Sequence, residues 1–148
     1  MWDVVVGVNA VLSTAIVAIA ATYAARQVKE ARHSRAIATL LSIHGEYQSP
    51  ELSRVRRRLQ CDQLGDLRAL IPEDRERLGN LLQKLELLAF LVNRDLVDTD
   101  DVVALFPGIP LTFSKARPYV EMRRQVHPDY ARQTERLVLK YDRDVSAH

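Results

Sequence analysis

The feature that most constrains this chain is an uncharged run of 22 residues near its start, from Val4 to Ala25. Nine of these residues are Val, Leu or Ile, and seven are Ala. As an α-helix the run would be about 33 Å long, which is enough to cross a hydrocarbon core of about 30 Å. It therefore predicts a transmembrane anchor over residues 1–25.

The residues on either side of the run predict its orientation. Aromatic rings near both ends suit the two headgroup layers, and a basic stretch follows the run while Asp3 precedes it. The positive-inside rule then predicts a single-pass membrane protein with its N-terminus outside and its C-terminal part in the cytoplasm. The predicted contacts with membrane lipids are Trp2, Tyr23, Arg26, Lys29, Arg32 and Arg35.

Two other interpretations of the run stay open. A signal peptide would need a basic start, which Met1-Trp2-Asp3 does not provide. A soluble helical bundle with the apolar helix buried inside it would also explain the composition. Small residues recur along one face of the helix, which is a pattern typical of spans that associate with a second copy or another membrane protein, although an alanine-rich helix shows it by chance as well. They are Gly7, Ala10, Thr14, Ala18, Ala21 and Ala25.

The rest of the chain predicts an all-α fold. We expect residues 26–48 to continue the anchor as a juxtamembrane helix and residues 49–148 to form a small cytoplasmic helical bundle. Ser49 and Pro50 suit the start of a helix, as does Pro72, which leads a helix that ends near Asn93. Asp98 or Thr99 suits the cap of a short helix.

Three later prolines mark further predicted boundaries. Residues 107–110 form a predicted loop, Pro118 begins a new segment or kinks its helix, and Pro128 opens the last helix. Leucines at helical spacing after Pro72 mark the centre of the core. The predicted core residues are Leu81, Leu82, Leu85, Leu88, Phe90, Phe106 and Leu137.

Few residues suggest chemistry. Glu30 and His33 have half of a di-iron spacing without a second half, and His44 with Glu46 lacks the spacing of helical zinc ligands. We interpret Cys61 as a small buried hydrophobic residue. No catalytic residue, metal site or cofactor is expected, and with a net charge of only +2 neither is nucleic-acid binding.

A dense basic run lies in the helix that follows Pro50. Arg54, Arg57 and Arg58 share one face of that helix. They predict either a contact with anionic headgroups or an ordinary solvated face.

The order of several short motifs points to a family. A marginal N-terminal span and a basic helix precede Ser49-Pro50-Glu51-Leu52, and the leucine-rich helix leads to Leu96-Val97-Asp98. Arg117-Pro118-Tyr119 and His127-Pro128-Asp129-Tyr130 follow. Together they resemble the bacterial domain-of-unknown-function family numbered forty-seven sixty. The resemblance implies a bacterial, membrane-anchored helical protein, for which the predicted orientation gives the bacterial inner membrane, and it brings no activity.

Two classes of function follow from these observations. The first is a membrane-tethered interaction or scaffolding module, which needs only what the sequence already contains. The second is a small hydrolase or metal-dependent enzyme on the same scaffold, which would need a convergent polar pocket.

Overall fold

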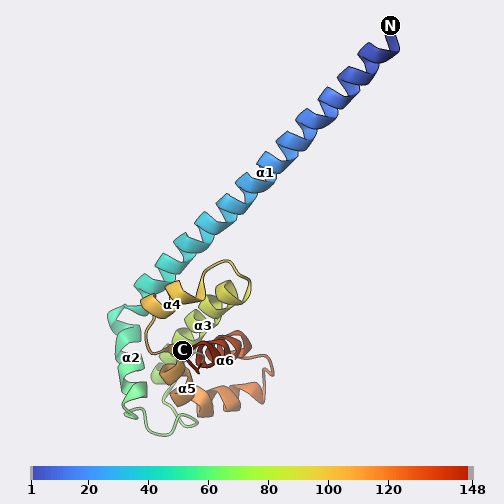
Figure 1. Cartoon of the computed structure of the whole chain (residues 1–148). Coiled ribbons are helices and arrows are strands. Elements are labelled where there is room, and N and C mark those ends of the chain that lie inside the picture. Colours follow the sequence, from blue (N-terminus) through green and yellow to red (C-terminus); the bar gives the residue numbers. More distant parts are fainter. Residues whose placement is uncertain (1, 147–148) are drawn as a thin grey trace. The chain divides into compact units, whose positions relative to one another are not determined.

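The computed structural model describes the backbone of residues 2–146, and the side chains of residue 17 and of residues 20–143. Within these limits the chain is all-α, with six helices and no strand, as the sequence predicts (Figure 1). The helices are α1 (Trp2–Tyr47), α2 (Pro50–Gln60), α3 (Pro72–Asn93), α4 (Thr99–Leu105), α5 (Ile109–Arg124) and α6 (Arg132–Ser146).

The chain divides into two compact units, one up to Arg35 and one from Ala36 onward. The first unit is the longer part of α1, and every residue from Ala20 to Arg35 is exposed. Within the described part of the chain, no helix combines the length and the apolar character needed to cross a membrane. Most of the predicted span, namely the side chains of residues 4–16, 18 and 19, lies outside that described part.

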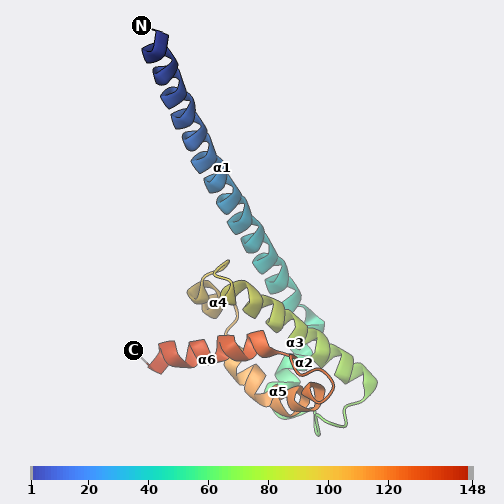
Figure 2. The same ribbon diagram turned by 90° about the vertical axis from the view of Figure 1, so that its right-hand side faces the viewer.

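The second unit is a helical bundle arranged around α3. The last turns of α1 join it through a stripe at helical spacing, formed by Ala36, Leu40, Ile43 and Tyr47, all of which are buried. Helix α3 packs against α2, α4 and α6, and α5 packs against both α2 and α6. Helices α3 and α6 lie side by side, as Figure 2 shows.

Local sequence signals explain several helix starts. Ser49 caps α2 and accepts a hydrogen bond from the Leu52 backbone N–H at 3.4 Å, with Pro50 at the first helical position. Pro72 begins α3, and its first turn carries Glu73 and Asp74, where the helix dipole favours negative charge. Asp98 caps α4. These predicted boundaries are confirmed.

Two predicted boundaries were wrong. The loop predicted over residues 107–110 is shorter, because Gly108 takes a left-handed conformation with φ of 87° and α5 already begins at Ile109. Pro110 fits the first turn of a helix, where the missing N–H would have had no intrahelical partner. Helix α6 begins at Arg132 and not at Pro128, after Ala131 with φ of 56°. Helix α5 continues through Pro118.

The predicted core is confirmed except for one residue. Leu81, Leu82, Leu85, Leu88, Phe106 and Leu137 are each at most 2% exposed. Phe90 is 39% exposed, because it lies on the side of α3 away from the buried leucines, with the Arg94 guanidinium 5.4 Å from its ring. Cys61, interpreted as buried, is exposed at the C-terminal end of α2.

Candidate functional site

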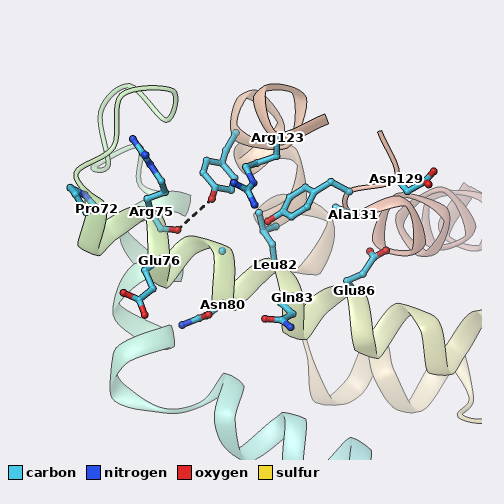
Figure 3. Close-up of a pocket in the computed structure, with 13 residues that line it drawn as sticks. Pro72, Arg75, Glu76, Asn80, Leu82, Gln83, Glu86, Arg123, Asp129 and Ala131 are labelled. Atoms are coloured by element: carbon cyan, nitrogen blue, oxygen red, sulfur yellow. Dashed lines mark hydrogen bonds between the residues drawn. The ribbon is translucent and has the colours of Figure 1, made fainter. Parts of the chain in front are cut away.

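The bundle surface has a cleft of about 650 Å³ between α3, α5 and the connection that leads into α6 (Figure 3). A volume of this order is typical of sites for small organic molecules. Its lining combines apolar, aromatic and charged side chains from all three segments. The lining residues are Pro72, Arg75, Glu76, Gly79, Asn80, Leu82, Gln83, Glu86, Tyr119, Arg123, Asp129, Tyr130 and Ala131.

The floor of the cleft is one face of α3, where Gly79 leaves a gap. A glycine inside a helix costs about 1 kcal/mol relative to alanine. A Cβ atom at this position would lie 3.6 Å from the Tyr119 hydroxyl, which is an ordinary contact, so steric exclusion does not require glycine here. Gly79 and the buried Leu82 both line the cleft.

Two tyrosines form the far side of the cleft. The Tyr119 hydroxyl donates a hydrogen bond to the Arg75 carbonyl oxygen at 3.4 Å, drawn as the dashed line in Figure 3. The rings of Tyr119 and Tyr130 meet edge to face with centroids 6.4 Å apart. Burial, with smaller effects of Tyr119 and Glu86 that outweigh Arg123, raises the pKa of Tyr130 to about 12. Tyr130 is therefore neutral at pH 7 and can act as a hydrogen-bond donor.

Arg123 lies in the last turn of α5, with its guanidinium 5.4 Å from the centre of the Tyr130 ring. Its Nε atom is buried and has no hydrogen-bond partner among the described residues. The neighbouring Arg124 differs: its Nε donates to the Tyr130 carbonyl oxygen and its Nη2 contacts the Glu135 carboxylate, both at 2.9 Å. A buried donor without an acceptor costs free energy, so Arg123 is the least satisfied polar group in the cleft.

Two of the acidic residues in the cleft are engaged elsewhere. The Glu86 carboxylate accepts hydrogen bonds from the Gln133 N–H at 3.0 Å, the Thr134 N–H at 2.9 Å and the Thr134 hydroxyl at 2.8 Å. It thereby caps the start of α6. Asp129 forms an ion pair with Arg132 at 2.9 Å. Glu76 points away from Arg123 in Figure 3 and is exposed.

The three arginines of the predicted basic face of α2 have different surroundings. Arg58 pairs with the buried carboxylate of Asp74 at 2.8 Å, so this guanidinium has a partner inside the bundle. Arg54 and Arg58 both line a second, smaller cleft of about 320 Å³, whereas Arg57 is exposed and is not part of that lining. Contact of the three arginines with anionic headgroups stays a prediction.

The predicted residues of α1 lie in or near the first unit. Tyr23, Arg26, Lys29, Arg32 and Arg35 are exposed. Ala21 and Ala25, from the predicted helix–helix interface, are exposed as well. The side chains of Trp2, Gly7, Ala10, Thr14 and Ala18 lie outside the described residues.

The isolated histidines and acids do not converge. The His44 ring packs edge to face against Phe106, with centroids 5.3 Å apart, and Glu46 forms an ion pair with Lys84. Glu30 and His33 are exposed on α1. Across the part of the chain that the structure describes, no group of three or more His, Cys, Asp or Glu side chains could hold a metal ion.

Sequence reasoning did not find the cleft. Gly79 interrupts the leucine-rich helix, which was a usable signal because glycine is unfavourable there. Tyr119 and Tyr130 each follow a proline closely, in motifs that predict helix boundaries and the family but not a cleft. Arg123 carried no signal among 21 basic residues, since its burial depends on the packing of α5 against its neighbours.

Comparisons with known proteins give a family and no function. A family model described as a domain of unknown function, DUF4760, matches residues 10–141. No curated protein and no solved structure matches the chain. The match includes the described end of α1 and the whole of α2 to α5, as well as most of α6. The chain therefore belongs to the DUF4760 family of domains of unknown function.

Proposed function

We propose that this chain is a membrane-tethered interaction module, in which the start of α1 anchors the helical bundle at the inner face of a bacterial cell membrane. The observation that carries the proposal is the exposure of every residue from Ala20 to Arg35. This segment continues directly from the uncharged run Val4–Ala25 within one 46-residue helix. An isolated helix obtains little stability from its own hydrogen bonds, so a long exposed helix favours an external environment that stabilises it.

The basic residues after the run support the proposed orientation. Arg26, Lys29 and Arg32 are exposed and are therefore available to anionic headgroups, each contributing about 1 kcal/mol near the surface. The bundle would then lie on the cytoplasmic side. Its proposed role is binding and not catalysis, because the cleft between α3, α5 and the start of α6 offers hydrogen-bond donors and aromatic rings, and its described lining holds no nucleophile placed beside a general base.

Membrane extraction tests the proposal. We expect the full chain to stay in the membrane pellet after a sodium carbonate wash. Ile16→Arg places a charge inside the uncharged run, which costs about 3 kcal/mol at the centre of a span, and should release a large fraction of the protein. Val28→Arg is the matched control, because Val28 is an exposed apolar residue beyond the run. Carbonate release of the wild-type chain would refute the anchor.

Reporter fusions test the orientation separately. A reporter fused after His148 should be active only if it is one that works in the cytoplasm. Activity of a periplasmic reporter at the same position would place the bundle outside and refute the orientation, while leaving the anchor itself intact.

A further inference from the structure

We infer that the cleft between α3, α5 and the start of α6 binds a small organic carboxylate, with the carboxylate against Arg123 and an apolar body against the tyrosine rings. This inference goes beyond the proposed tethering and does not depend on it, because every residue involved lies in the second unit.

Arg123 has a buried Nε–H group without a hydrogen-bond acceptor among the described residues. Some arginines of the bundle have carboxylate partners: Arg58 pairs with Asp74, Arg77 with Glu51 and Arg124 with Glu135. For Arg123, the described residues supply the face of Tyr130 but no acceptor for the buried Nε. A guanidinium in this state is suited to an incoming anion, since its planar N–H groups match the two oxygens of a carboxylate.

The acidic residues near Arg123 do not neutralise its charge. Glu86 already accepts three hydrogen bonds from the start of α6, and Asp129 pairs with Arg132. These carboxylates nevertheless lie around the cleft and make it unfavourable for a group with two negative charges. Arg75, which also lines the cleft, keeps its charge, but a hydrogen bond to the Leu70 carbonyl oxygen at 3.0 Å holds its guanidinium. Among the described residues of the lining, this leaves Arg123 as the cation with a buried, unpaired N–H, which matches a single negative charge.

The apolar and aromatic lining of the cleft indicates what the rest of the ligand is. Besides Arg123, the cleft is lined by the buried Leu82, by Gly79 and by Tyr119 and Tyr130, whose rings meet edge to face. Apolar and aromatic surfaces of this kind stabilise an apolar or aromatic body by removing it from water. A volume of about 650 Å³ accommodates a molecule of that size. The ligand class is therefore a monocarboxylate with an apolar body.

The arginine Nε–H signals in NMR spectra of the full chain in detergent micelles provide the test. The probe is N-acetylphenylalanine, and its neutral amide is the matched control ligand. A second probe is the tripeptide Gly-Gly-Phe, which tests whether the cleft binds the C-terminal carboxylate of a peptide and not only a small free acid. The Arg123 signal is identified by its loss in Arg123→Gln. We expect N-acetylphenylalanine, the tripeptide or both to shift this signal saturably, and the amide to leave it unchanged.

Matched variants decide the assignment. Arg123→Gln should weaken binding about tenfold or more, because a charged hydrogen bond is lost. Arg117→Gln on the same helix should have no effect, since Arg117 is exposed and pairs with Glu121. Gly79→Ala adds a methyl group next to Tyr119, should fold at least as well as the wild type, and should also weaken binding. If Arg123→Gln does not fold, the affinity of Gly79→Ala for N-acetylphenylalanine tests whether the ligand binds in this cleft.

Several results would overturn the inference. These are equal affinity for the acid and its amide, unchanged affinity in Arg123→Gln or in Gly79→Ala, and no saturable shift with either carboxylate. Tighter binding of inorganic phosphate than of N-acetylphenylalanine would overturn the choice of a monocarboxylate. A chain that is released by carbonate yet binds N-acetylphenylalanine through Arg123 would separate this inference from the membrane anchor.

Discussion

Replacement of Glu86 tests whether one carboxylate on α3 holds the start of α6. Its two oxygens accept three hydrogen bonds, all between 2.8 and 3.0 Å, from Gln133 and Thr134. Thr134 is completely buried, so its hydroxyl would have no water to replace Glu86. Glu86→Ala therefore removes both a helix cap and the acceptor of a buried donor.

The expected loss of stability follows from these two contributions. Loss of an N-terminal cap costs about 1 kcal/mol and up to about 2 kcal/mol. A buried hydroxyl left without a partner adds about 1–3 kcal/mol. We expect Glu86→Ala to lower the free energy of unfolding by about 2–5 kcal/mol, a large share of the roughly 5–15 kcal/mol typical of a domain. Glu86→Gln retains one acceptor oxygen and should lose about half as much.

Urea unfolding followed by far-ultraviolet circular dichroism measures these differences. Glu76→Ala is the matched control, because Glu76 is an exposed glutamate on the same helix. Thr134→Val removes one of the three donors while keeping the shape of the side chain. A double-mutant cycle with Glu86→Ala should give a coupling of about 1 kcal/mol or more, as expected for side chains in direct contact.

Amide hydrogen exchange gives the local result. The amides of Gln133 and Thr134 should exchange faster in Glu86→Ala than in the wild type. A loss within about 0.5 kcal/mol of the Glu76→Ala control, together with unchanged exchange at these amides, would refute the capping role.

Three further predictions address the core, the cleft and the anchor. Leu85→Ala should cost about 2–5 kcal/mol, because Leu85 is 1% exposed, whereas Leu87→Ala at a position 41% exposed should cost much less; equal losses in urea unfolding would contradict the assigned core. Because the pKa of Tyr130 is raised to about 12, the fold keeps a proton that the unfolded chain loses above about pH 10, so stability should fall as pH rises from about 10 to 12. The stability of Tyr130→Phe should lack that part of the decline. Phenolate absorbance measures the pKa of Tyr130 in the wild type, and an ordinary tyrosine pKa of about 10 would contradict its burial. In a transmembrane association assay, Ala18→Leu should weaken self-association more than Ala20→Leu, which lies away from the small-residue face; matched signals would leave the segment as a plain tether.

Local residue chemistry determined most of the helices. Ser49, Pro50, Pro72 and Asp98 act on neighbouring backbone groups, so the starts of α2, α3 and α4 were readable without tertiary information. The periodicity of the leucines in α3 identified the buried face for the same reason. The prediction that Phe90 is buried was wrong, because a hydrophobic residue is buried only if it lies on the face of the helix that packs, and Phe90 lies away from that face.

The tertiary structure decided where α6 begins and where the cleft lies. Proline is common at helix starts, but α6 begins at Arg132 and not at Pro128. The N–H groups of Gln133 and Thr134 donate to the Glu86 carboxylate, which lies 47 and 48 residues before them in the sequence. The cleft likewise needs Gly79 from α3, Arg123 from α5 and Tyr130 from the following connection. A helix cap made by a neighbouring residue leaves a pattern in the sequence. A cap or a pocket made by distant segments leaves none, because packing alone brings its parts together.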